Sequence, residues 1–199
     1  MKRIILIFTL LLISASSLWA YRLMYAEQYY KLYHMHFYQD PSDCNENLFY
    51  LEHALKSPFV NPLNAMATIQ NEAQWERYRY LFYLHVNLKM TEQYRLLASK
   101  YDKFNAYFYN YPWKQENLDS LEYAYSYYDT ALYYWDQALE WADKLATVPY
   151  HHLSEVQEWE DELYRINTGE LDYREFIGMD LERLEEVRAA FRAMDENTY

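Results

Sequence analysis

Apolar and aromatic side chains recur every three or four residues along most of the chain, which is the period of an amphipathic α-helix. From Tyr25 to Phe37, for example, every fourth residue is aromatic, so these rings share one helix face. Prolines and capping residues such as Asp43 mark where one periodic segment ends and the next begins. The pattern predicts helices at residues 22–38, 43–56, 62–69, 71–98, 101–109, 114–147, 153–166 and 172–194.

The stretch 78–88 also fits a β-strand, because it is rich in aromatic residues that favour strands. A strand there would need turns and a pairing partner, yet no glycine or proline lies between Pro62 and Pro112. A helix that is buried on nearly all sides fits the stretch better.

The segment 114–147 has the most regular pattern in the chain. Its apolar residues form a seam in alternating steps of three and four residues: Leu118, Leu121, Tyr125, Tyr128, Leu132, Trp135, Leu139, Ala142 and Ala146. A second line repeats every seven residues and consists of small side chains that let another helix approach closely: Ala124, Ala131 and Ala138.

The polar side of the same segment is almost wholly acidic, and Lys144 is the only basic residue nearby in the sequence. We call this side the acidic ridge, and it consists of Asp119, Glu122, Asp129, Asp136, Glu140 and Asp143. Like charges at helical spacing repel one another, whereas mixed signs stabilise an exposed helix. The acidic ridge is therefore either a solvated helix face or a docking surface for a basic partner.

Four residues of this helix match the second half of a tetratricopeptide repeat, in which small residues lie where paired helices cross. They are Tyr128, Ala131, Trp135 and Ala138. Aromatic residues return 34 residues earlier, beginning at Tyr94, but the alanines do not. The sequence therefore predicts an all-α fold, with degenerate tetratricopeptide-like hairpins or an irregular helical bundle as the two alternatives.

The composition supports a helical fold. The chain has 199 residues but only two glycines, Gly169 and Gly178. Hairpin turns, P-loops and dinucleotide-binding turns all need residues that tolerate positive φ. The scarcity of glycine therefore argues against all-β proteins, P-loop NTPases and dinucleotide-binding folds.

Residues 1–20 have the pattern of a secretory signal peptide, in which a basic start, an apolar stretch ending at Ile13 and small residues lead to a cleavage position after Ala20. The alternative is an uncleaved membrane anchor, for which the apolar stretch is short. We expect an exported, periplasmic protein without a lipid anchor. Its expected organisation is a helical domain at 21–148 and a C-terminal helical hairpin or tail at 149–199.

The formal net charge of −12 repels nucleic acids and anionic membrane surfaces. The remaining partners are proteins with a basic surface, peptides and saccharides. Tyrosine, of which the chain has 25, is well suited to such contacts because its ring is rigid and its hydroxyl forms hydrogen bonds. Cys44 is the single cysteine, so the chain has no internal disulfide.

The sequence carries no recognisable catalytic motif. His34 and His36 point to different faces of their helix, and only His151 and His152 with Glu155 could bind a metal opportunistically. We expect no catalytic residue, no metal site and no cofactor. A carboxylate-based hydrolase is the one enzyme class left open, although nothing marks its acid or its nucleophile.

Three sequence blocks occur together: Tyr25–Lys31, Trp75–Phe82, and Ser99–Phe104 continued by Tyr107–Lys114. Together they resemble an exported, tyrosine-rich, tetratricopeptide-like helical family of spirochaetes that is linked with the periplasmic flagellar motor collar. The resemblance covers residues 21–146 and implies a non-enzymatic scaffold that binds proteins of the cell envelope. The alternative is a periplasmic binding protein whose Tyr-lined groove takes a small ligand or a saccharide.

Overall fold

The computed structural model describes residues 23–104 and 109–197, which fold into helices without a β-strand. The all-α prediction is therefore confirmed for this part of the chain, while the predicted signal peptide at 1–20 lies outside the described residues. The helices are α2 (Ala26–Gln39), α3 (Cys44–Lys56), α4 (Glu72–Ser99), α5 (Lys114–Ala146), α6 (Gln157–Asn167) and α7 (Tyr173–Ala193). Short 3₁₀ turns occur at Pro62–Asn64, Tyr111–Trp113 and Ser154–Val156.

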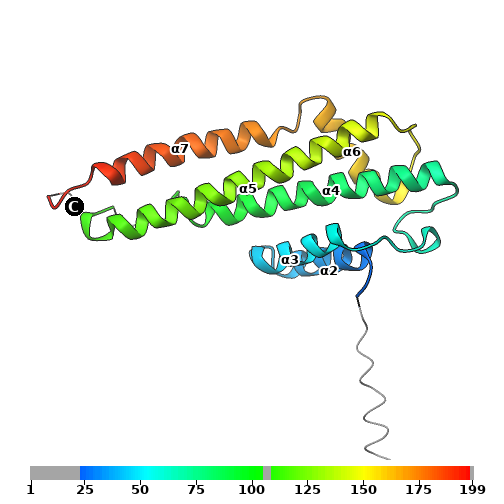
Figure 1. The fold of residues 1–199 in the computed structure, drawn as a ribbon, viewed down its shortest axis with the longest axis horizontal. Coiled ribbons are helices and arrows are strands. Elements are labelled where there is room, and N and C mark those ends of the chain that lie inside the picture. Colours follow the sequence, from blue (N-terminus) through cyan, green and yellow to red (C-terminus); the bar gives the residue numbers. More distant parts are fainter. Residues whose placement is uncertain (1–22, 105–108, 198–199) are drawn as a thin grey trace, which may run out of the picture.

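Helices α4 and α5 form a long antiparallel hairpin around which the other helices pack (Figure 1). The α2–α3 hairpin lies against α4, α7 lies along α5, and α6 contacts both arms of the hairpin. The hairpin runs from residue 72 to residue 146, about twice the length of a 34-residue tetratricopeptide repeat. Tyr94 and Tyr128 therefore lie on its two opposite arms, and the irregular bundle is the alternative that describes the fold.

The helix boundaries follow the capping residues. Asp43 accepts a hydrogen bond from the backbone N–H of Glu46 at the start of α3, and Asp172 accepts two at the start of α7. Gly169 ends α6 with a φ of 75°, a left-handed conformation that suits glycine. These caps confirm the predicted starts of α3 and α7 and the predicted stop of α6.

Two predicted helices are wrong. The one at 62–69 is only the 3₁₀ turn Pro62–Asn64. The one at 101–109 is not helical at residues 101–104, and residues 105–108 lie outside the described part. There the Asp102 carboxylate accepts the Phe104 backbone N–H at 3.0 Å, a local hydrogen bond that competes with helix formation.

The buried seam of α5 has the predicted step of three and four residues but a partly different phase. It consists of Asn117, Leu121, Ala124, Tyr128, Ala131, Trp135, Ala138, Ala142 and Leu145. The seam proposed from the sequence is wrong at Tyr125, which is 43% exposed, and at Ala146. The line of alanines lies in the core because small side chains let the neighbouring helices approach.

Helix α4 is buried around most of its circumference, which confirms the helical interpretation of the stretch 78–88. Its buried face includes charged groups that need partners from other helices. Arg77 forms a two-bond ion pair with Glu160 of α6, with Nε–Oε1 and Nη2–Oε2 distances of 2.6 Å each. Both side chains are less than one-tenth exposed, so this pair fixes α6 on α4.

The C-terminal segment shares the core of the rest of the chain. Trp159 and Leu163 of α6 pack with α2, α3 and α4, and Ile177 and Leu184 of α7 pack with α4 and α5. The boundary expected at residue 148 therefore falls inside one packed unit. In the part of the chain that the structure describes, no helix is long and apolar enough to cross a bilayer.

We predict that Arg77→Met lowers the free energy of unfolding by about 3–5 kcal/mol, because it leaves the Glu160 carboxylate buried without its counter-charge. The double variant Arg77→Met/Glu160→Leu should recover most of this loss. Arg79→Met is the matched control, since Arg79 pairs at 3.8 Å with the exposed Glu72 and should contribute less than about 1 kcal/mol. Urea denaturation measures all three, and equal losses for Arg77→Met and Arg79→Met would contradict the prediction.

Candidate functional site

A line of aromatic side chains runs along one face of the α4–α5 hairpin, and we call it the aromatic stripe. Its members on the first arm are Tyr80, Tyr83 and Tyr94 of α4, with Tyr101 just beyond the end of that helix. Its members on α5 are Tyr123, Tyr127, Tyr133, Tyr134 and Trp141. Neighbouring rings contact across the hairpin. The Tyr94 and Tyr134 rings stack with centroids 5.4 Å apart, and those of Tyr83 and Trp141 stack at 4.5 Å.

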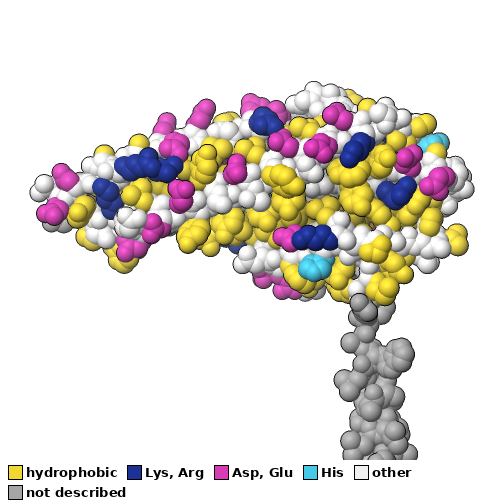
Figure 2. Space-filling model, viewed as in Figure 1, with side chains coloured by type: hydrophobic (Ala, Val, Ile, Leu, Met, Phe, Trp, Pro, Cys, Tyr) yellow, Lys and Arg dark blue, Asp and Glu magenta, His cyan; other side chains and the backbone are white. Residues whose placement is uncertain are grey.

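The aromatic stripe is only partly covered by the rest of the fold. Tyr123 and Tyr133 are 58% and 57% exposed, while the other members are half-buried. Burial raises the pKa of Tyr134 to about 12, with the nearby Tyr94 contributing, so this phenol stays protonated at neutral pH. Figure 2 shows one face of the molecule, on which hydrophobic side chains gather over α2, α3 and the adjoining parts of α4 and α5. The stripe is thus an apolar surface that also offers hydroxyl donors.

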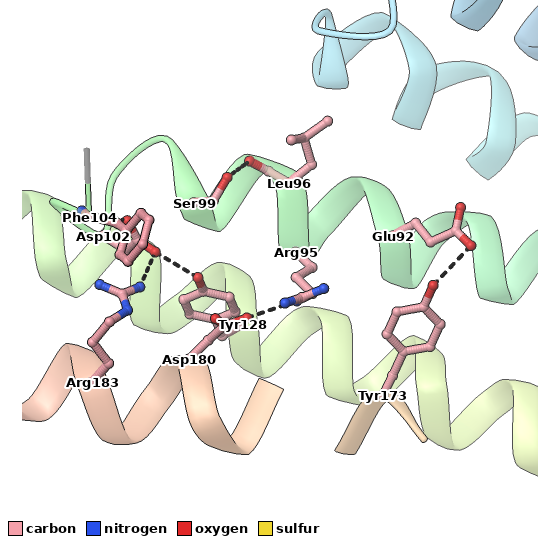
Figure 3. Close-up of a pocket in the computed structure, with 10 residues that line it drawn as sticks. All are labelled: Glu92, Arg95, Leu96, Ser99, Asp102, Phe104, Tyr128, Tyr173, Asp180 and Arg183. Carbon is pink, nitrogen blue, oxygen red and sulfur yellow. Dashed lines mark hydrogen bonds and ion pairs between the residues drawn. The ribbon is translucent and has the colours of Figure 1, made fainter. Parts of the chain in front are cut away.

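A cavity of about 350 Å³ lies where the C-terminal half of α4 meets α5 and α7 (Figure 3). Asp102 is buried beside it and accepts hydrogen bonds from the Tyr128 hydroxyl at 2.8 Å and from Arg183. On the neighbouring wall, Arg95 Nε lies 2.8 Å from Asp180 Oδ2. Within each ion pair the arginine offsets the charge of the aspartate.

The remaining walls of this cavity are aromatic and apolar, with Phe104, Leu96 and Tyr173 among the lining residues. Glu92, its third carboxylate, accepts a hydrogen bond from the Tyr173 hydroxyl at 3.0 Å and one from Lys89. Each carboxylate of the lining is thus held by a donor. The arrangement is suited to binding a small polar molecule with an apolar part.

A buried chain of polar groups crosses the core between α2, α4 and α6. The Tyr30 hydroxyl lies 2.8 Å from His85 Nε2, and His85 Nδ1 lies 2.6 Å from Glu162 Oε2. Trp159 stacks on the His85 ring at 5.2 Å. Burial raises the pKa of Tyr30, so its hydroxyl remains protonated.

The groups of Tyr30, His85 and Glu162 are of the kinds that form an acid–base relay, but their surroundings differ from those of an open active site. Tyr30, His85 and Glu162 are 7%, 1% and 7% exposed, so the core encloses most of this group, although Glu162 also lines a small surface pocket. Burial alone would raise the pKa of Glu162, but its contacts with His85 and Lys89 outweigh burial and lower it. These hydrogen bonds therefore fix the packing of α2, α4 and α6 on one another.

The acidic ridge lies on the outer side of α5, but two of its members have partners that the sequence did not reveal. Glu122 pairs with Arg188 at 3.1 Å, and Asp136 pairs with Arg174, both from α7. The expectation that basic residues are missing is therefore wrong for these two. Among the described residues, no cation lies within ion-pair distance of the remaining four: Asp119, Asp129, Glu140 and Asp143. Docking on the ridge stays a prediction.

The four residues assigned to repeat-like packing all lie in the core: Tyr128, Ala131, Trp135 and Ala138. Trp135 meets the Tyr173 ring edge to face at 5.6 Å. Cys44 is also buried, and its thiol donates to the Ser42 carbonyl at 3.6 Å. None of these side chains is available to a partner.

The structure does not gather His151, His152 and Glu155 into a metal-ligand set. Glu155 instead accepts a hydrogen bond from the Thr68 hydroxyl at 2.6 Å, which helps to lower its pKa to about 2. In the described part of the chain, a different group of potential ligands converges at the turn between α2 and α3. It consists of His36, Asp43 and Glu46.

Sequence comparison places the central hairpin and the C-terminal helices in a known family. The family model described as a domain of unknown function, DUF8513, matches residues 73–194. No curated protein and no solved structure gives a significant match to the chain. The matched residues contain the whole aromatic stripe, the cavity and the acidic ridge, whereas α2 and α3 lie before them.

We predict that Glu162 makes the protein sensitive to acid. The pKa of Glu162 is lower in the folded protein than in the unfolded chain, where it is about 4.3. The ionised carboxylate therefore contributes its full stabilisation above about pH 4.3, and this contribution is lost as the pH falls through the pKa of the folded state. Glu162→Gln should lower the free energy of unfolding by about 2 kcal/mol at pH 7 and should flatten the decline below about pH 4.5.

Urea denaturation at a series of pH values measures this dependence. Glu158→Gln is the control, because Glu158 is exposed on the same helix. Parallel pH curves for the wild type and Glu162→Gln would contradict the prediction.

Proposed function

The chain belongs to the DUF8513 family, and we propose that it is a non-enzymatic scaffold that binds another protein through the aromatic stripe, which lies within the matched residues. The single observation that carries the proposal is the exposure of Tyr123 and Tyr133 beside half-buried rings. Tyrosine is enriched at protein interfaces because it adds a large contact area with little loss of conformational entropy. In a bundle with an adequate core, rings left in water at one face support a role in recognition.

The dimensions of the stripe suit a protein partner. From Tyr123 to Trp141 it follows α5 for roughly 27 Å, at the rise of about 1.5 Å per residue. This length accommodates several turns of a partner helix laid along the stripe. A small ligand or a single sugar ring would cover only a fraction of it.

The charge beside the stripe indicates the kind of partner. Tyr133 lies between Asp129 and Asp136 in sequence, four and three residues away, so the stripe and the acidic ridge meet on this side of α5. Asp129 has no cation within ion-pair distance among the described residues. A partner that combines apolar and basic side chains would match both features.

The proposal includes export to the periplasm, which the N-terminal sequence pattern supports. It also includes a place in an envelope assembly such as the spirochaetal flagellar motor collar. The support for that place is the sequence resemblance, whose blocks Tyr25–Lys31 and Trp75–Phe82 fall in α2 and α4.

A second candidate function is the binding of a small molecule, and the observation in its favour is the cavity lined by Tyr128, Tyr173 and the two arginine–aspartate pairs. Its volume of about 350 Å³ lies at the lower end of the usual range for ligand pockets. A ligand binder of this kind would show an increase in melting temperature with a small molecule.

We predict that the double variant Tyr123→Ser/Tyr133→Ser loses capture of its partner from a native envelope extract by about tenfold or more, because two contact rings are removed. Its melting temperature should stay near that of the wild type, since both side chains are more than half exposed. The control is Tyr164→Ser on α6, outside the stripe, where the ring is 63% exposed. Quantitative mass spectrometry of the captured proteins gives the measurement.

The capture should also weaken as the salt concentration rises, because the expected partner is basic. Unchanged capture by the double variant would sink the proposal. Enrichment of motor or collar proteins would support the specific assembly, and enrichment of other envelope proteins would support only the scaffold role.

A further inference from the structure

The turn that joins α2 to α3 brings three potential metal ligands together. His36 comes from the last turn of α2, Asp43 is the N-cap of α3, and Glu46 lies in the first turn of α3. One ligand atom from each of these side chains lies within 4.8 Å of the other two. The cluster precedes the residues that match the family, so it is independent of the aromatic stripe.

The imidazole of His36 is held so that one nitrogen faces the other two ligands. Its Nδ1 lies 2.9 Å from Asn47 Oδ1. Asn47 is fully buried, and its amide nitrogen donates to Gln93 Oε1 at 3.2 Å, which makes Oδ1 the acceptor toward His36. Nδ1 therefore carries a proton, which leaves Nε2, 3.5 Å from Glu46 Oε2, as the nitrogen that a metal would bind. Metal-binding histidines are commonly oriented by such a hydrogen bond to their second nitrogen.

The two carboxylates are held in a similar way. Glu46 Oε1 accepts the Tyr50 hydroxyl at 2.6 Å, and Asp43 Oδ1 accepts the Glu46 backbone N–H at 3.2 Å. Each carboxylate thus has one oxygen bound by the protein and one oxygen left for a further partner. Both ligand oxygens reach solvent, since Asp43 is half-buried and Glu46 is exposed, so water can complete a coordination shell.

The spacing between the ligand atoms fits a cation better than a direct contact. His36 Nε2 and Glu46 Oε2 lie 3.5 Å apart, and in the neutral imidazole with its proton on Nδ1 both of these atoms are hydrogen-bond acceptors. Two ligands at about 2.0–2.1 Å from a tetrahedral zinc ion are separated by roughly 3.3 Å. We propose that His36, Asp43 and Glu46 bind one divalent transition-metal ion of the Zn²⁺ class, with water as the fourth ligand.

The mixed set of one imidazole nitrogen and two carboxylate oxygens suits zinc and its neighbours in the first transition series. Mg²⁺ and Ca²⁺ prefer shells made of oxygen alone and should not compete. Bound here, the ion would connect the end of α2 to the start of α3. Because Asn47 also contacts Gln93 of α4, this connection would stabilise the packing of the α2–α3 hairpin on α4.

The competing explanation is a protonated His36 in an ion pair with Glu46. That ion pair would not need Asp43, whereas the metal site does. Asp43→Asn therefore separates the two, because asparagine also caps a helix well but is a much weaker metal ligand.

The test is titration of the purified protein with Zn²⁺ alone, by isothermal calorimetry near pH 7.5. We expect one ion per chain and a higher melting temperature in its presence. His36→Gln, Asp43→Asn and Glu46→Gln should each weaken binding by about tenfold or more, and Tyr50→Phe should weaken it less, by removing only the group that orients Glu46. His34→Gln is the control, since His34 is exposed on the same helix and should bind zinc as the wild type does.

Three results would overturn the proposal: a Zn²⁺ dissociation constant weaker than about 0.1 mM, affinity unchanged by all three ligand variants, or loss of binding only in His151→Gln/His152→Gln. Circular dichroism of each variant shows that it is folded. If a variant does not fold, the wild type is titrated with Co²⁺ instead. A visible absorption spectrum typical of tetrahedral Co²⁺ would support the site, and one typical of octahedral Co²⁺ would oppose it.

Discussion

The fold depends on the burial of α4, a helix that carries polar side chains into the core and must find partners for them there. Arg77 meets Glu160, and His85 meets Tyr30 and Glu162, at distances of 2.6–2.8 Å. A charge left unpaired in such a position costs several kcal/mol. These contacts therefore favour the observed placement of α2 and α6 on α4, because a shift of α6 would leave Arg77, Glu160 and Glu162 buried without these partners.

This placement determines which surfaces remain free. With α2, α3 and α6 packed on α4 and with α7 packed on α5 (Figure 1), the stripe rings Tyr123 and Tyr133 stay exposed. Helix α7 also supplies Arg174 and Arg188 to part of the acidic ridge, which reduces repulsion along α5. The surface proposed for a partner consists of exposed stripe rings and of the ridge carboxylates that α7 does not pair. Its apolar and acidic parts meet at Tyr133.

Much of the fold could be predicted from the sequence because it depends on local chemistry. Caps such as Asp43 and Asp172 act on the next few residues, and the apolar period identifies a helix without reference to its neighbours. The phase of the α5 seam could not be predicted, because Tyr125 and Tyr128 are equally apolar and only the neighbouring helices decide which is buried. The candidate cavity was missed for the same reason. Arg95 and Asp180 are 85 residues apart in sequence, and such pairings exist only once the chain has folded.

The central claim is that residues on both sides of position 148 form one cooperative unit held by the buried contacts of α4. Native-state hydrogen exchange measures this directly, because it gives an opening free energy for each protected amide. We expect the central amides of α4 and α6 to exchange at one common free energy, equal to that of global unfolding. Exchange of α6 and α7 at a clearly lower free energy, with α4 and α5 still protected, would contradict the account.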